Sequence, residues 1–399
     1  MKILFLGYAV NPAETAHLTG VSVAGNKMQA NILKEASKDK HIKLSVITVF
    51  PAAPYPHDKK IWYGYKKIKV VPGVMASRPG FCNIPVLKQI TQILSVYNCA
   101  KRHYHIDKDT ILLTYNMYPQ TGIPAVWLKR KYGCRICTIL ADLPVEDFKR
   151  KTCSVRYLLR KSFSNLTEKL IRQCDQIAAL NEHAVKIFAP EVPYIIVEGG
   201  IPSDTPKSYR RRYALKRKNL LYSGALTGYS GIMDLIRAMD MVTNQEVELD
   251  IYGDGYLEGK IKKAAEHNPR IRYHQSVSNT RMLRIQKQAY ALINPRPVDN
   301  PVAKVTFPSK IFEYMLSGRP VITTKLNGLS ADFLENLYVT ESDTPQGMAK
   351  EIDTVMSLPE KELSDKAQAA FSFVVDNMTW DKQWGRIREF MKNNYEDWK

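Results

Sequence analysis

The sequence predicts an α/β fold of two domains, each with a mostly parallel sheet that helices cover on both faces. The chain has 399 residues, which is long for a single hydrophobic core and sufficient for two domains of ordinary size. Apolar strands alternate with amphipathic helices through both halves, and this alternation is typical of parallel sheets joined by helical crossovers. Apolar residues make up 45% and charged residues 24% of the chain, which is the balance of a globular protein.

The first domain is expected over residues 1–202. Short apolar runs rich in β-branched residues predict its strands, and runs with apolar residues at helical spacing predict its helices. The expected strands are residues 2–6, 43–49, 110–115, 135–140, 176–180 and 194–198. The expected helices are residues 24–38, 86–103, 120–132, 155–173 and 182–188.

The second domain is expected over residues 218–378, after a basic linker at residues 203–217. The same patterns predict its strands, with helices between them. The expected strands are residues 219–222, 246–252, 270–274, 289–293, 320–323 and 337–339. Residues 379–399 predict one more amphipathic helix, which carries Trp380 and Trp384.

The segment from Phe307 to Ile322 holds the most informative pattern. A short helix is expected to begin near Pro308 and Ser309, with Lys310 and Glu313 in its first turn. A helix N-terminus has unpaired N–H groups and a partial positive charge, so it binds phosphate. Lys310 adds a charge there, and Glu313 lies on the same face as an acceptor for ribose hydroxyls. This turn therefore predicts a nucleotide site.

Ligands of parallel sheets bind beyond the carboxyl ends of the strands, so we expect the two sheets to face each other across a cleft.

Four segments in order resemble motifs of glycosyltransferase family 4. Residues 307–322 look like its nucleotide-sugar-binding motif, and residues 220–239 resemble the first strand, loop and helix of its donor domain. Residues 249–255 resemble the next strand with its glycine turn. Residues 294–297 stand where the family has the end of the strand before the donor helix. The resemblance covers the C-terminal half and, more loosely, the N-terminal half.

This resemblance implies the GT-B fold, with two facing Rossmann-like domains and a cleft between them. It implies a retaining, metal-independent transferase whose donor sits on the second domain and whose acceptor enters from the first. No cofactor is implied, because the nucleotide-diphosphate sugar, expected to be UDP-linked, is a substrate. The resemblance also implies that the final helix crosses back to the first domain.

The chain departs from the family pattern at its paired glutamates and at the histidine of the first domain. Glu313 matches the second glutamate, but Val305 stands in place of the first. Asp299, in the preceding loop, is the carboxylate that we expect to replace it. The histidine position is Ala141, and the neighbouring Asp142 is expected to contact the acceptor or the donor sugar; the alternative for Asp142 is a cap of the next segment.

The phosphate-binding arginine and lysine of the family are also replaced. Ala225 and, with looser spacing, Ser230 stand at their positions. Lys310 and Arg296 are the nearest cations that can take over the contact with the diphosphate.

Glycines after the predicted strands complete the expected site. Gly20 and Gly25 precede the first helix and allow a close backbone approach to a ligand, although a flexible hinge explains them as well. Gly224 follows a predicted strand, and Gly253 with Asp254 follows the next, where a plain tight turn is the alternative.

The expected catalytic residues are Asp142, Lys310 and Glu313. The expected donor-binding residues are Gly20, Gly25, Gly224, Gly253, Asp254, Asn294, Arg296, Asp299, Pro308, Ser309, Lys310 and Glu313.

The charge of the chain indicates an anionic partner. Fifty-eight basic against 39 acidic residues give a net charge of +19, which suits a phosphate-bearing substrate or an anionic membrane. Residues 155–173 predict a basic amphipathic helix that either lies on such a membrane or buries its apolar face in its own domain. Aromatic residues do not interleave with the basic runs, so no nucleic-acid partner is expected.

Cysteine usage and hydropathy indicate a cytoplasmic protein. Six scattered cysteines, all in the first half, predict free thiols, although Cys134 and Cys137 have metal-like spacing. No run of about 18 apolar residues exists, so no membrane-spanning helix is expected. The predicted location is the cytoplasm, with peripheral contact at the inner face of the membrane.

The predicted function is transfer of a sugar from a nucleotide-diphosphate sugar to a glycan or lipid-linked acceptor, in surface polysaccharide or glycolipid assembly. One alternative is a nucleotide-sugar epimerase of the same fold, which needs no acceptor. The other is a protein that lost its chemistry and binds nucleic acid or membrane; steep salt dependence without nucleotide-sugar affinity distinguishes it.

Overall fold

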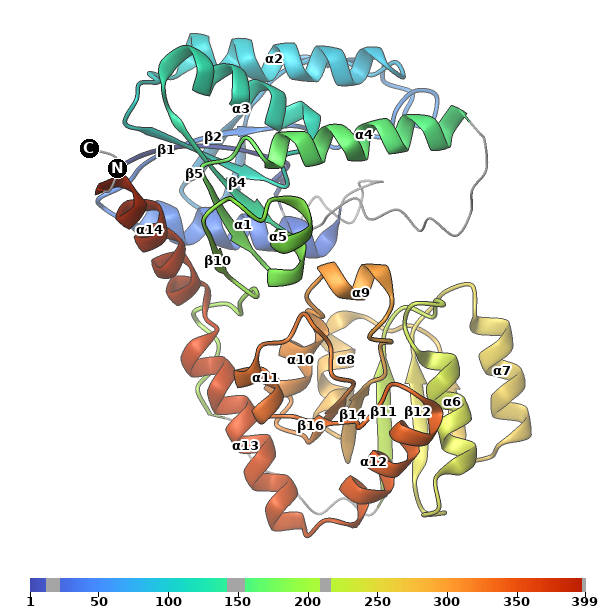
Figure 1. The fold of residues 1–399 in the computed structure, drawn as a ribbon. Helices are drawn as coiled ribbons and strands as arrows, with labels where there is room; N and C mark the ends of the chain where they lie inside the picture. Colours follow the sequence, from blue (N-terminus) through green and yellow to red (C-terminus); the bar gives the residue numbers. More distant parts are fainter. Residues whose placement is uncertain (12–21, 142–154, 209–216, 397–399) are drawn as a thin grey trace. The chain divides into compact units, whose positions relative to one another are not determined.

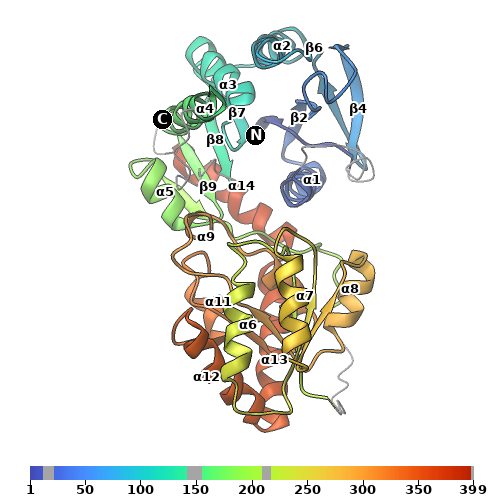
Figure 2. The same ribbon diagram turned by 90° about the vertical axis from the view of Figure 1, so that its right-hand side faces the viewer.

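The computed structural model describes residues 1–11, 22–141, 155–208 and 217–396 (Figures 1 and 2). They form two compact units. The first unit runs to Gly199 and also takes in the helix that begins at Trp380, and the second unit is Gly200–Thr379. Ile201 forms a parallel bridge with Thr379. The chain therefore enters and leaves the second unit through adjacent segments.

The first unit contains a sheet of eight strands within its described residues, in the order β10-β9-β8-β7-β1-β2-β5-β4. All neighbours are parallel except β4 and β5, which are antiparallel. The strands are β1 (Lys2–Gly7), β2 (Lys43–Thr48), β4 (Lys66–Val71), β5 (Val74–Arg78), β7 (Thr110–Tyr115), β8 (Arg135–Leu140), β9 (Gln176–Ala179) and β10 (Tyr194–Ile196). A separate antiparallel ribbon pairs β3 (Trp62–Tyr63) with β6 (Phe81–Cys82).

Helices cover both faces of this sheet. They are α1 (Val23–Lys38), α2 (Leu87–His103), α3 (Pro119–Tyr132), α4 (Val155–Ile171), α5 (Glu182–Phe188) and α14 (Trp380–Glu396). α3 packs against both α2 and α4, and the three lie side by side on one face (Figure 1). On the other face α1 contacts α14, whose Trp380, Trp384, Ile387 and Met391 are buried in the same core as β1. The last helix is thus part of the first unit.

The second unit has six parallel strands in its described residues, in the order β13-β12-β11-β14-β15-β16. They are β11 (Asn219–Ser223), β12 (Glu248–Tyr252), β13 (Ile271–His274), β14 (Ala291–Asn294), β15 (Val321–Thr323) and β16 (Tyr338–Val339). The order reverses direction between β11 and β14. Such a reversal is where open parallel sheets bind ligands.

Helices also cover the second sheet. They are α6 (Ile232–Met241), α7 (Glu258–His267), α8 (Asn279–Gln286), α9 (Pro301–Val305), α10 (Lys310–Leu316), α11 (Ala331–Glu335), α12 (Pro345–Ser357) and α13 (Glu360–Asn377). α6 and α12 pack together over a core with β11, β12 and β14. α10 packs against α13. The predicted α/β fold with two parallel sheets is confirmed.

Two expectations from the sequence need comment. The pattern did not predict the short strands β3 to β6, because each spans only two to six residues and β4 carries exposed Lys66, Lys67 and Lys69 as edge strands often do. Helix α4 buries Leu170 and Ile171 but leaves Leu158 and Leu166 exposed, so its apolar face is only partly covered.

Candidate functional site

The loops that follow β11 and β12 contact each other through their backbones. The Gly224 N–H donates to the Tyr252 carbonyl over 2.9 Å, and the Leu226 N–H donates to the Asp254 carbonyl over 2.8 Å. Gly253 has a φ of +152°, and a Cβ there would lie 1.8 Å from the Gly224 carbonyl oxygen. Contact between the two loops thus requires a glycine at 253.

The loop after β14 joins this group. Gly231, just before α6, has a φ of +75°, and a Cβ there would lie 1.7 Å from the Pro295 carbonyl oxygen. The Asn294 side chain donates to the Thr323 hydroxyl over 3.1 Å, which links the ends of β14 and β15. The carboxyl ends of four neighbouring strands are therefore held together at one edge of the second sheet.

A buried tyrosine fixes α10 to the same edge. The Tyr314 hydroxyl accepts from the Ser223 backbone N–H over 3.0 Å and donates to the Ser223 carbonyl over 3.1 Å. The Gln286 side chain from α8 donates to the Ser223 hydroxyl over 3.2 Å. Burial raises the pKa of Tyr314 to about 12, so the hydroxyl stays neutral and can both donate and accept. The sequence analysis missed this tyrosine, although it follows the predicted Glu313 directly.

The start of α10 carries the predicted Lys310 and Glu313. The Pro308 carbonyl accepts from the Ile311 N–H over 2.9 Å, and the Ser309 side chain makes no capping bond. The Lys310 side chain is exposed, yet enough protein surrounds its ammonium group to lower its pKa, with the Glu313 carboxylate opposing that shift. Among the described residues, no carboxylate forms an ion pair with Lys310.

Arg296 lies in the loop after β14 and is half-buried. Its guanidinium donates from Nη2 to the Thr306 hydroxyl over 2.9 Å, while its Nε is buried without a partner. Burial lowers the pKa of Arg296, and the groups that oppose the shift are the tyrosines Tyr229 and Tyr222. Within the described chain no carboxylate pairs with it. A guanidinium in this setting favours an anionic ligand, because burying an unpaired charge is costly.

Three further predicted residues lie nearby. Asp254 is exposed in the loop after β12. Asp299, expected to replace the missing glutamate, has a side chain that is 93% exposed and pairs with Lys304 over 3.0 Å. Val305, at the missing glutamate's position, is buried in α9.

The first unit has a cavity of about 470 Å³ at the carboxyl ends of β1, β2 and β7. Gly25 lines it from the first turn of α1, where its N–H donates to the Ser22 hydroxyl over 3.0 Å. Because the Ser22 cap already uses that N–H, Gly25 cannot donate it to a ligand in the cavity. Gly20 and Asp142, also predicted in this domain, lie outside the described residues.

Polar aromatic side chains line the same cavity. The Tyr8 hydroxyl donates to the Gln120 side chain over 3.2 Å, and the rings of Tyr8 and Tyr118 pack edge to face at 5.8 Å. Burial raises the pKa of Tyr8 far above its usual value. The sequence analysis missed these residues, although Tyr8 and Tyr118 come shortly after predicted strands, where ligand contacts are expected.

The backbone beyond β7 is unusual at this cavity. Asn116 and Met117 both have positive φ values, of 63° and 46°. The buried Asn116 side chain accepts from the Ala141 N–H over 2.7 Å and so ties the end of β7 to the end of β8. Left-handed residues other than glycine cluster at functional sites, since the surrounding structure must hold them there.

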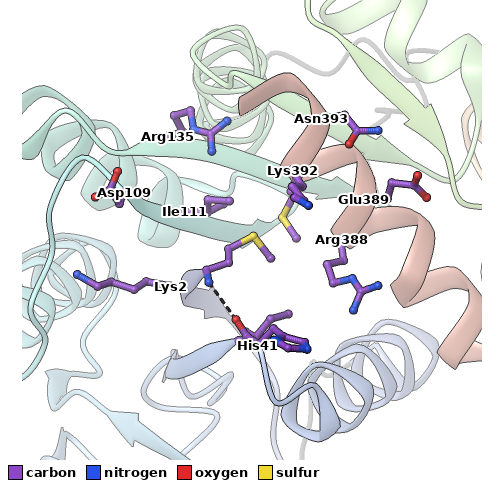
Figure 3. A pocket seen from close by; sticks show the side chains of 12 residues that line it. Lys2, His41, Asp109, Ile111, Arg135, Arg388, Glu389, Lys392 and Asn393 are labelled. Carbon is purple, nitrogen blue, oxygen red and sulfur yellow. Dashed lines mark hydrogen bonds between the residues drawn. The ribbon is translucent and has the colours of Figure 1, made fainter. Parts of the chain in front are cut away.

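A larger cavity, of about 1010 Å³, lies at the opposite edge of the first sheet (Figure 3). Lys2, Ile111 and Arg135 line it from the amino-terminal ends of their strands, and Arg388 from α14. Arg388 already pairs with Asp39 over 2.6 Å. Ligands of parallel sheets bind at the carboxyl edge, so we do not assign the activity to this cavity.

The described residues contain no group of three or more His, Cys, Asp or Glu side chains arranged to hold a metal ion. None of the helices in the described part of the chain is long and apolar enough to span a membrane.

Residues 217–357, within the second unit, match the family described as "Glycosyl transferases group 1". No curated protein matches the chain. Among solved structures, sucrose-phosphate synthase from Thermosynechococcus elongatus has a TM-score of 0.68 at 12% identity, with 100% of both chains covered.

The lipopolysaccharide outer core galactosyltransferase WaaB has a TM-score of 0.66 at 16% identity, covering 99% of this chain and 100% of its own. Anabaena HepE, in complex with UDP-glucose, has a TM-score of 0.63 at 13% identity, covering 98% and 99%. The second unit thus contains a region similar to the group 1 glycosyltransferases, and the chain has the GT-B fold of two Rossmann-like domains.

Proposed function

We propose that this protein is a retaining glycosyltransferase that moves a sugar from a UDP-sugar to a glycan or lipid-linked acceptor in surface polysaccharide or glycolipid assembly. The observation that carries the proposal is the pair of cations Lys310 and Arg296. Both stand at the carboxyl edge of the second sheet, and surrounding protein lowers the pKa of each. Among the described residues neither forms an ion pair with a carboxylate, although the Glu313 carboxylate opposes the pKa shift of Lys310. A diphosphate supplies the missing negative charge.

The match of residues 217–357 to the group 1 glycosyltransferases supports the same reading. So does the fold shared with HepE, whose structures are described in complex with UDP and with UDP-glucose. These proteins are distant in sequence, and the proposal for this chain therefore rests first on its own residues.

In the proposed reaction the bond between the anomeric carbon and the diphosphate oxygen breaks. The acceptor hydroxyl forms the new bond on the same face of the sugar, and its proton passes to the leaving diphosphate. Lys310 and Arg296 stabilise the negative charge that develops on the diphosphate, without a metal ion. Glu313 accepts hydrogen bonds from the ribose and fixes the angle of the breaking bond.

We propose that the acceptor binds in the 470 Å³ cavity of the first unit. Tyr8, Tyr118 and Gln120 offer it hydroxyl and amide groups beside aromatic rings. Such a lining suits a sugar, whose hydroxyls need hydrogen-bond partners and whose ring faces pack on aromatic side chains.

We further propose a cytoplasmic setting. The five cysteines in the described residues are free. Burial raises the pKa of Cys134 and of Cys137 to about 12, so these thiols are unreactive. Free cysteines of this kind are usual in proteins of a reducing compartment.

The test is thermal stability against UDP-, GDP-, ADP- and dTDP-sugars, with and without EDTA. A ligand at about 100 times its Kd adds about 2.7 kcal/mol to the free energy of unfolding. We expect stabilisation by a UDP-sugar that EDTA does not change and that Lys310→Ala and Glu313→Ala abolish. Lys361→Ala, a change of an exposed lysine on α13, is the matched control.

Stabilisation by no nucleotide sugar, or equal stabilisation of the Lys310→Ala variant, would exclude the donor site. Conversion of the donor sugar in the absence of any acceptor would show an epimerase instead.

A further inference from the structure

The first unit exposes an unusual group of apolar side chains near the start of α2. Besides Tyr65 and Met75, eight large apolar residues between positions 55 and 94 are each between 38% and 64% exposed. They are Tyr55, Ile61, Trp62, Ile84, Val86, Leu87, Ile90 and Leu94. We call them the α2 patch. Single exposed apolar residues are ordinary, but a continuous group marks a surface that binds something.

Backbone contacts bring the segments of the α2 patch together. The Asn83 N–H donates to the Ile61 carbonyl over 2.7 Å, and the Tyr55 N–H donates to the Asn83 carbonyl over 2.9 Å. Trp62 pairs with Cys82 in the β3–β6 ribbon. These bonds bring positions 55, 61 and 62 beside the segment that leads into α2. Along the helix itself, Leu87, Ile90 and Leu94 are spaced three and four apart and share one face.

The conformation of Val86 adds a second observation. Its φ is 71°, which β-branched residues rarely adopt, and its side chain is 64% exposed. It precedes α2 without any side-chain capping bond. The chain thus holds an apolar side chain in water in a conformation that costs free energy. Such costs are typical of binding surfaces.

The charge around the α2 patch identifies the partner. Residues 59–106 contain no Asp or Glu, and their basic residues are Lys59, Lys60, Lys66, Lys67, Lys69, Arg78, Lys88, Lys101 and Arg102. Lys59, Lys60 and the three lysines of β4 are exposed. Asp58, between Tyr55 and Ile61, is the one acid in the span of the patch, and its carboxylate accepts from the Tyr63 hydroxyl. Apolar side chains beside such an excess of basic residues complement an anionic lipid bilayer, which offers acyl chains beneath negative headgroups.

The residue types also favour a lipid surface over an acidic protein. Trp62 and Tyr55 are aromatic residues of the kind that settle at the level of lipid headgroups. The flexible lysine side chains can extend along the bilayer and keep their charges in water. α3, which packs beside α2, adds Arg130 and Lys131, while its Lys129 pairs with Asp175 over 2.6 Å.

We propose that the α2 patch is the surface by which this protein docks on an anionic membrane, with Trp62, Val86, Leu87 and Ile90 entering the headgroup region. The surface differs from the basic helix α4, for which the sequence pattern left membrane contact and burial in its own domain as alternatives. It goes beyond the proposed transferase activity and does not depend on it, because vesicle binding can be measured without donor or acceptor.

The experiment is sedimentation of the full chain with vesicles of phosphatidylglycerol and phosphatidylcholine, against vesicles of phosphatidylcholine alone. We expect binding to the anionic vesicles that falls in about 0.5 M NaCl, because salt screens the headgroup charges. The triple variant Val86→Ser, Leu87→Ser, Ile90→Ser should bind about ten-fold or more weakly.

The matched control is Ile187→Ser, Met241→Ser, Leu283→Ser, three residues of similar exposure outside the patch, and it should bind like the wild type. Fluorescence quenching by brominated lipid gives an independent readout. Trp62 is 61% exposed, so Trp62→Phe should fold normally and should remove most of the quenching.

Three results would overturn the proposal. The first is no binding to anionic vesicles. The second is equal binding by the patch variant and the control variant, or quenching that Trp62→Phe leaves unchanged. The third is a dimer in solution that dissociates in the patch variant while vesicles bind neither form, which would show that a second copy covers the patch.

Discussion

The Tyr314 hydroxyl lies 3.0 Å from the Ser223 backbone nitrogen and 3.1 Å from the Ser223 carbonyl oxygen. Tyr314 is on α10, next to Glu313, and Ser223 is the last residue of β11. Tyr314 therefore fixes α10, which carries the proposed donor contacts, to the end of β11 at the carboxyl edge of the second sheet. Tyr314 thus helps to position Lys310 and Glu313, together with the other buried side chains of α10.

Removing that hydroxyl should weaken both stability and donor binding. Tyr314→Phe leaves the buried Ser223 N–H without a partner, which should lower the free energy of unfolding by about 1–3 kcal/mol. Denaturant unfolding measures the loss, and the KM for the donor should rise as α10 loosens. Tyr256→Phe is the matched control, because the exposed Tyr256 hydroxyl accepts from the Gly228 N–H in the same way. An equal effect of both changes would contradict the role given to Tyr314.

A side chain at position 253 should be severely destabilising. A Cβ there would meet the Gly224 carbonyl oxygen at 1.8 Å, and the φ of +152° is unfavourable for any residue with a side chain. Gly253→Ala should therefore cost about 3 kcal/mol of unfolding free energy. Gly259→Ala, in α7 where no atom lies within 4 Å, should instead stabilise by about 0.5–1 kcal/mol. Thermal unfolding of the two variants measures both effects. A small loss of stability in Gly253→Ala would mean that the loops after β11 and β12 can separate.

Replacing Arg296 should separate stability from binding. The guanidinium is half-buried and has no carboxylate partner among the described residues, so Arg296→Met should change the free energy of unfolding by no more than about 1 kcal/mol. The affinity for UDP should fall by about ten-fold or more, because a charge-assisted contact to phosphate is lost. Calorimetric titration with UDP measures this. Unchanged affinity would remove Arg296 from the donor site.

Donor binding should weaken in alkaline solution at a pH below the ordinary pKa of lysine. Burial lowers the pKa of Lys310 from 10.5, so the ammonium loses its proton earlier than in a free lysine. Below the lowered pKa the charged form binds phosphate, and binding is lost as the pH rises through it. Lys310→Arg does not titrate in this range and should keep its affinity for UDP flat with pH. If the affinity for UDP depends on pH in the same way in the wild type and in Lys310→Arg, Lys310 does not contact the ligand.

The local pattern of the sequence determined most secondary structure. Period-2 and period-3.6 spacing depend only on neighbours in the chain, so the strands of both sheets other than β4 and β5, and the helix at 310–316, were predicted within a few residues. The positions of Lys310, Glu313 and Asn294 at the carboxyl edge follow from the order of strand, loop and helix. The edge to which a parallel strand delivers its next loop is set by its direction.

Other features exist only through contacts between distant segments. Tyr314 looked like one more apolar residue of a short helix until Ser223, 91 positions away, proved to be its partner. A glycine is needed at 253 because of the nearby Gly224 carbonyl, and Arg296 is notable because, in the described parts of the chain, no carboxylate pairs with it. The α2 patch likewise needs the β3–β6 ribbon, which is too short to show a period, to bring Trp62 beside Val86. Periodicity along the chain indicated where most of the longer elements lie, whereas only the packing of the elements decided which side chains are buried, paired or left exposed.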